Sequence, residues 1–176
     1  MDIVESLYKD AFELDKFLML NNEVSLRVSA DANLRKSILL ASASFYERQV
    51  CDLIIEYVGS RTNDERVVSF VTTKAISRQY HTLFDWNSNN CNSFLGLFGP
   101  AFKKSFTERI AMKPELDDAV KLFLEIGRER NRMVHQDFGQ YALEKTSEEI
   151  CGIHQNAKLF VSELRASLFG VEVTTI

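Results

Sequence analysis

The stretch PELDDAVKLFLEIGRERNRMVH, residues 114–135, decides the fold class. It begins with proline, which suits the first position of a helix, and it has acidic residues in the first turn. Its apolar residues recur at helical spacing. They are Leu116, Ala119, Val120, Phe123, Leu124 and Ile126. The pattern predicts a long amphipathic helix with an arginine-rich segment at its carboxyl end.

That segment places three arginines, an asparagine and a histidine within residues 128–135. Four of these side chains share one side of a helix that turns by about 100° per residue: Arg128, Asn131, Arg132 and His135. Arg130 lies about 140° from His135 on the same helix. Either the helix loosens near Met133, or Arg130 has a different task from the other four residues.

A cationic stripe that ends in histidine suits the chemistry of phosphate esters. Arginine holds a phosphate oxygen through two parallel hydrogen bonds and stays charged, and histidine takes and gives a proton near pH 7. A purely structural reading stays open beside this one. Helices often end in cations because positive charge suits the negative end of the helix dipole.

The run from Arg130 to His135 resembles the R-N-x-x-x-H signature of HEPN domains, which are small helical domains of prokaryotic defence, toxin-antitoxin and RNA-processing systems. A second segment, Ala43-Ser44-Phe45-Tyr46-Glu47, is similar to the small-small-aromatic-Glu segment of the RiboL-PSP-like HEPN branch. The resemblance covers residues 31–169, roughly the whole chain after the first predicted helix.

The resemblance implies a metal-independent endoribonuclease that needs no cofactor and cleaves RNA through its own 2′-hydroxyl. The catalytic candidates are Arg130, His135, Asn131 and Glu47. The candidates for substrate binding are Arg128 and Arg132. Since one chain has a single motif histidine and the reaction needs both an acid and a base, we expect a homodimer with a shared site. An antitoxin or another defence protein is a further expected partner.

Two alternatives stay open at this point. The same residues could hold RNA or a nucleotide phosphate without cleaving it, as a binding module of a multi-protein defence complex. The chain could also be a purely structural helical partner.

Composition limits these readings. A length of 176 residues predicts a single domain, and a net charge of −4 excludes binding of nucleic acid through overall charge. Any RNA contact must be local, with Lys103, Lys104 and Arg109 as further candidates. Three scattered cysteines, an acidic amino terminus and the lack of a long apolar run predict a cytoplasmic protein without a membrane segment or metal site.

Periodicity and helix-end signals predict an up-and-down bundle of five to seven helices. We expect helices over residues 2–20, 31–58, 62–81, 101–112, 114–135 and 146–169. Asp31 should begin the second helix and Gly59 should end it. His154 has no evident partner in the sequence. Residues 171–176 are expected to form a tail or a contact with another chain.

Overall fold

A computed structural model describes residues 1–170; the predicted tail, residues 171–176, lies outside the described residues. Eight α-helices and one π-helical segment form the regular structure of the described chain, and no strand occurs there. These elements are α1 (Ile3–Leu20), α2 (Val24–Arg61), α3 (Glu65–Val71), η1 (Thr72–Ile76), α4 (Tyr80–Leu83), α5 (Asn92–Gly96), α6 (Pro100–Met112), α7 (Pro114–His135) and α8 (Ser147–Phe169). The predicted all-α class is confirmed.

There are more helices than the predicted five to seven because the third predicted helix is divided and because α5 forms between the third and fourth predicted helices. It begins at Glu65 instead of Thr62, since Asp64 and not Thr62 caps it by accepting from the Arg66 amide. It then passes into the π-helical segment η1, and α4 follows as a separate short helix.

The predicted bounds of the second helix, residues 31–58, are wrong. Helix α2 begins at Val24 and ends at Arg61, so it runs through both predicted end signals. Asp31 does not cap a helix but pairs with Arg35 one turn later, at 2.7 Å. Gly59 continues the helix because a glycine inside a helix costs only about 1 kcal/mol relative to alanine.

The described chain forms two compact units. The first consists of residues 1–45 and 125–156, and the second of residues 46–124 with the described part of 157–176. Helices α2, α7 and α8 contribute to both units. The single domain expected from the length stays a prediction.

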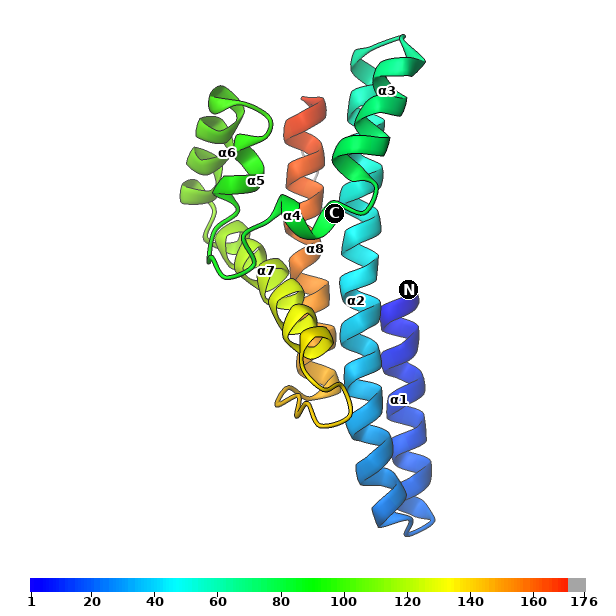
Figure 1. Ribbon diagram of the computed structural model, residues 1–176. Coiled ribbons are helices and arrows are strands. Elements are labelled where there is room, and N and C mark those ends of the chain that lie inside the picture. Colours follow the sequence, from blue (N-terminus) through cyan, green and yellow to red (C-terminus); the bar gives the residue numbers. More distant parts are fainter. Residues whose placement is uncertain (171–176) are drawn as a thin grey trace. The chain divides into compact units, whose positions relative to one another are not determined.

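In the first unit, α1 and the beginning of α2 form a helical hairpin (Figure 1). A buried polar cluster joins this hairpin to α8. The His154 ring is fully buried, with Nδ1 2.9 Å from Ser42 Oγ and Nε2 3.0 Å from Asp2 Oδ2. Asp2 also caps α1. These partners were not evident in the sequence, because Ser42 and Asp2 lie 112 and 152 positions away from His154.

The second unit has an aromatic core, as the 13 phenylalanines suggested. Phe84 stacks on Phe94 with ring centroids 4.3 Å apart, and Phe123 lies between Phe84 and Phe160 at 5.0 and 4.8 Å. This packing fixes the first half of α7, which carries the motif at its other end. No helix in residues 1–170 combines the length and the apolar character that crossing a membrane requires.

Candidate functional site

Helix α7 is unbroken up to its carboxyl end, where the motif lies. It ends at His135, and the amide of Gln136 still donates to the carbonyl of Arg132 at 3.0 Å, as in a regular helix. The helix therefore does not loosen near Met133, which is fully buried. The first of the two alternatives for Arg130 is excluded, and Arg130 points away from the side that His135 occupies.

Arg130 lies at the edge of the packed side of α7. It follows the buried Ile126 by four residues and precedes the buried Met133 by three, so the three side chains share one side of the helix. Its guanidinium is half-buried and donates from Nη1 to Asn131 Oδ1 at 3.2 Å. Within one chain, Arg130 is therefore bonded to Asn131 but lies about 140° around the helix from His135.

Arg132 is held by a carboxylate that our reading of the sequence missed. Its Nη1 donates to Glu129 Oε1 at 3.0 Å, and the Tyr141 hydroxyl donates to Glu129 Oε2 at 2.8 Å. Burial, the hydrogen bond to Glu129 and the charge of Glu129 raise the pKa of Tyr141 to about 12, so the phenol stays protonated. Glu129 lies three residues before Arg132 on the same helix, and this spacing was the available signal.

A hollow of about 600 Å³ lies on the Arg128 and Arg132 side of α7. Its lining consists of Glu125, Arg128, Glu129, Arg132, Gln136, Tyr141, Ala142, Glu144 and Lys145. Three cations face three carboxylates there, and Lys145 pairs with Glu125 at 2.6 Å. The hollow is therefore close to neutral. Among residues 1–170, Arg128 is the cation of this hollow whose side chain makes no ion pair.

His135 is exposed, and its ring makes no hydrogen bond or ion pair to any described residue. The segment that follows it, residues 136–146, is held by two cations of α2. The buried ammonium of Lys36 donates to the Phe138 carbonyl at 2.6 Å and lies 4.9 Å from the centre of the Phe138 ring. Arg35 donates to the Leu143 carbonyl at 3.2 Å. The imidazole is thus open to solvent beside an anchored segment.

Glu47 is exposed on α2 and belongs to the second compact unit, whereas Arg130 and His135 belong to the first. The expected pairing of Glu47 with the motif stays a prediction. Within the described chain, no group of three or more histidine, cysteine, aspartate or glutamate side chains is arranged to hold a metal ion. Arg109, a further candidate for RNA contact, is bound to Glu163 at 2.8 Å in the second unit.

The comparisons with known proteins agree with the resemblance read from the motif. The family model described as RiboL-PSP-HEPN matches residues 5–168, so the match begins inside α1 and not at residue 31. Comparisons with curated proteins and with solved structures found no match. A HEPN domain is a nuclease or RNA-related module in general terms. Since the family model covers most of the sequence, this chain belongs to the RiboL-PSP-HEPN family.

Proposed function

We propose that this protein is a metal-independent endoribonuclease of a prokaryotic defence or toxin-antitoxin system. The observation that carries the proposal is the exposed His135 ring, which has no partner among the described residues and lies at the end of a helix that carries three arginines. Membership in the HEPN family supports a nuclease or RNA-related role in general. The specific reaction, its site and its biological setting are our proposal.

RNA supplies its own nucleophile, the 2′-hydroxyl, so the protein needs a base, an acid and a stabiliser of charge on the phosphate. His135 would take the 2′-hydroxyl proton or give one to the leaving 5′-oxygen, a role typically worth about 10² to 10⁴ in rate. An arginine fork would stabilise the negative charge that builds on the phosphate oxygens in the transition state. Asn131 would orient the guanidinium of Arg130, to which its side-chain oxygen is already bonded.

The contacts of the arginines support different roles for them. Arg132 is committed to Glu129, so its guanidinium is less free to bind a phosphate. Arg128 makes no such pair within residues 1–170 and is the better candidate for binding substrate. Arg130 is half-buried beside Asn131, so little rearrangement is needed to present its fork at a fixed position.

We infer further that two copies share one site. Arg130 and His135 leave a regular helix about 140° apart, so one chain does not direct both groups to the same side. A second copy would supply the missing group, and with it the second histidine that acid and base catalysis require. RNA and a second copy of this chain are therefore the proposed partners, and an antitoxin or another defence protein would restrain the activity.

A second candidate is a module that binds RNA or nucleotide phosphates without cleaving them. The geometry of a single chain favours it, because Arg130 and His135 leave the helix about 140° apart and holding a phosphate needs no histidine beside the arginine. The two candidates differ in whether RNA is cut and in whether toxicity depends on His135. A binding module retains RNA affinity and yields no new ends, and its toxicity on expression does not depend on His135.

The test is cleavage of a defined RNA in the presence of a metal chelator. We expect 2′,3′-cyclic phosphate ends, no cleavage of a substrate with 2′-deoxyribose at the cut site, and at least about 100-fold slower cleavage by His135→Ala. His81→Ala is the matched control, because His81 is also exposed and lies in the second unit. Cleavage that needs a divalent metal, cuts the deoxy substrate or survives His135→Ala would overturn the proposal.

A further inference from the structure

The hairpin of α1 and the beginning of α2 exposes an unusual amount of apolar surface. Ten of the sixteen large apolar side chains that are exposed in the described chain lie within residues 1–28. Four of them line one groove: Phe12, Met19, Val24 and Val28, which are between 51% and 70% exposed. We call this the hairpin groove. Exposed apolar side chains gathered in this way mark a surface that another molecule covers.

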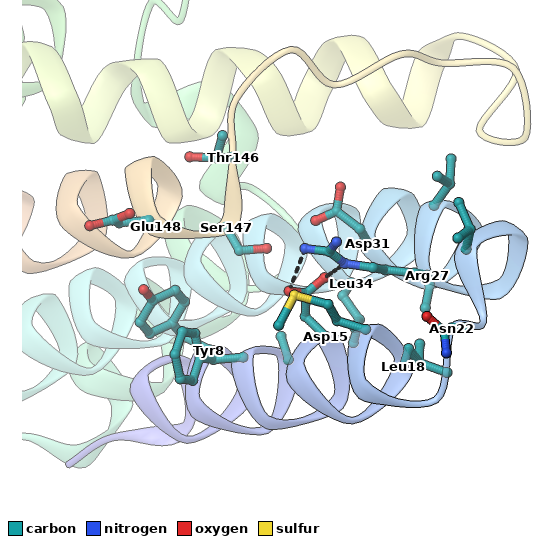
Figure 2. Close-up of a pocket in the computed structure, with 16 residues that line it drawn as sticks. Tyr8, Asp15, Leu18, Asn22, Arg27, Asp31, Leu34, Thr146, Ser147 and Glu148 are labelled. Atoms are coloured by element: carbon teal, nitrogen blue, oxygen red, sulfur yellow. Dashed lines mark hydrogen bonds and ion pairs between the residues drawn. The ribbon is translucent and has the colours of Figure 1, made fainter.

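The hairpin groove is a preformed cavity of about 770 Å³ between α1, the start of α2 and the start of α8 (Figure 2). Arg27 crosses from α2 to α1 inside it and binds Asp15 with two hydrogen bonds, of 2.6 and 2.9 Å. This fork holds the two helices at a fixed spacing. Because its walls are already in place, the groove can receive a ligand without rearrangement of the hairpin.

The charges at the hairpin groove indicate which class of molecule it binds. Its lining contains three acidic side chains, Asp15, Asp31 and Glu148, and one basic side chain, Arg27, a formal charge of −2. Arg27 pairs with Asp15 and Arg35 pairs with Asp31, whereas Glu148 is exposed at the rim. This field repels RNA, anionic membrane surfaces and the same hairpin of a second copy. It attracts an apolar ligand that carries positive charge.

The backbone of the groove walls indicates whether the bound segment is a strand or a helix. The main walls are helices, whose amides and carbonyls are bonded within each helix, so they offer no row of free backbone groups with which a strand could pair. A helix satisfies its own backbone and needs only side-chain contacts. An amphipathic helix lays its apolar stripe along such a groove and keeps its polar side in solvent.

We propose that the hairpin groove binds an amphipathic helix of a partner protein, with an apolar stripe against Phe12, Met19, Val24 and Val28 and with lysine or arginine on its flanks. The proposal does not rest on the ribonuclease function. None of the motif residues Arg128, Arg130 and His135 lines the groove, so cleavage and partner binding are measured separately.

The probe is a fluorescein-labelled 18-residue Leu/Lys peptide with a designed amphipathic helix, titrated with the full chain by fluorescence anisotropy. A Leu/Glu peptide with the same apolar stripe tests the charge, and a Leu/Lys peptide of scrambled order tests the stripe. We expect the amphipathic Leu/Lys peptide to bind with 1:1 stoichiometry at least about tenfold more tightly than either control, and its affinity to fall as salt is raised.

Phe12→Ser should weaken binding of the Leu/Lys peptide at least about tenfold, and Val28→Ser provides a second change in the wall that α2 forms. Phe70→Ser is the matched control, because Phe70 is as exposed as Phe12 but lies on α3 outside the groove. Both exposed sites tolerate serine without loss of the core, and circular dichroism checks this. Equal effects of Phe12→Ser and Phe70→Ser, or equal binding of the Leu/Lys and Leu/Glu peptides, would overturn the proposal.

The same variants identify the other possible occupants. If the free chain is a dimer by sedimentation and Phe12→Ser makes it a monomer, a second copy fills the groove and the proposal is wrong. Binding to anionic phosphatidylserine vesicles that Phe12→Ser abolishes would assign the groove to a membrane surface and would overturn it equally. Competition between RNA and the Leu/Lys peptide for groove binding would also contradict the charge argument.

Discussion

Replacing Arg109 with methionine tests whether this arginine stabilises the fold or is available for RNA. The Glu163 carboxylate on α8 is 2% exposed, and two cations of the second unit bind it. Arg109 Nη1 donates to Oε2 at 2.8 Å and Lys113 Nζ donates to Oε1 at 2.6 Å. Removing one donor leaves a buried carboxylate partly uncompensated.

The size of the effect follows from this geometry. A hydrogen bond to a charged group contributes about 1.5–3 kcal/mol, and because Arg109 is 38% exposed, solvent screening favours the lower part of that range. We expect Arg109→Met to lower the free energy of unfolding by about 2 kcal/mol. Arg109→Met combined with Lys113→Met should cost about 3–5 kcal/mol, since it leaves the buried charge without a partner.

Urea denaturation followed by circular dichroism measures these differences. Lys104→Met is the control on the same helix, because Lys104 is 79% exposed and lies 4.0 Å from Glu108 in a surface pair. Its effect should stay within about 0.5 kcal/mol. Adding Glu163→Met to the double variant should restore stability, since no buried charge then remains. The reasoning is refuted if Arg109→Met is as mild as Lys104→Met, or if Glu163→Met rescues nothing.

The contacts of Arg109 and Lys113 with Glu163 also make the stability of the fold depend on pH. Burial alone raises the pKa of Glu163, but the hydrogen bonds and charges of Lys113 and Arg109 outweigh burial and lower the pKa below its ordinary value. These contacts therefore stabilise the fold at pH values above the ordinary pKa of a glutamate. This contribution disappears as the pH falls through the lowered pKa of Glu163. The difference between wild type and Arg109→Met should shrink on acidification below about pH 4.

Three further predictions concern the proposed site. Arg130→Lys should cut RNA at least about tenfold more slowly in initial-rate assays, because a point charge does not replace a planar fork at phosphate, and full activity would contradict bidentate contact. Glu47→Gln should cause a smaller loss with a displaced pH–rate profile; an unchanged profile would make Glu47 a surface carboxylate only. Lys36→Met should speed amide hydrogen exchange in residues 136–146 at least about tenfold relative to the exposed control Lys16→Met, and equal protection would show that Lys36 does not hold this segment.

Elements with local signals at both ends were predictable from the sequence. Helix α7 begins at Pro114 and ends at His135, and α8 follows a capping box in which the Glu149 amide donates to Thr146 Oγ1 at 3.2 Å. Gly170, with φ of 71°, follows the end of α8, at the position after a helix that favours glycine. These features depend on residues within one or two turns of each other, which a sequence displays directly.

The features that could not be predicted depend on distant pairs. Lys36 reaches Phe138 across 102 positions, and His154 reaches Asp2 across 152. The length of α2 escaped prediction because Gly59 is a weak stop signal, and because Arg61 beyond it donates to the Leu168 carbonyl, 107 positions away in sequence. Glu129 differs from these residues, since its position three residues before Arg132 on one helix is visible in the sequence.

The distribution of charge reconciles an acidic protein with the proposed action on RNA. The whole net charge of −4 is accounted for by residues 1–34, so residues 35–176 are neutral in sum. Residues 127–135 contain three arginines and one glutamate, a local charge of +2. On the proposed function RNA would bind Arg128 and Arg130, which make no ion pair within residues 1–170, and on the further proposal a cationic helix would bind the hairpin groove. The overall charge therefore does not argue against either proposal, because each ligand responds to the charges near its own surface.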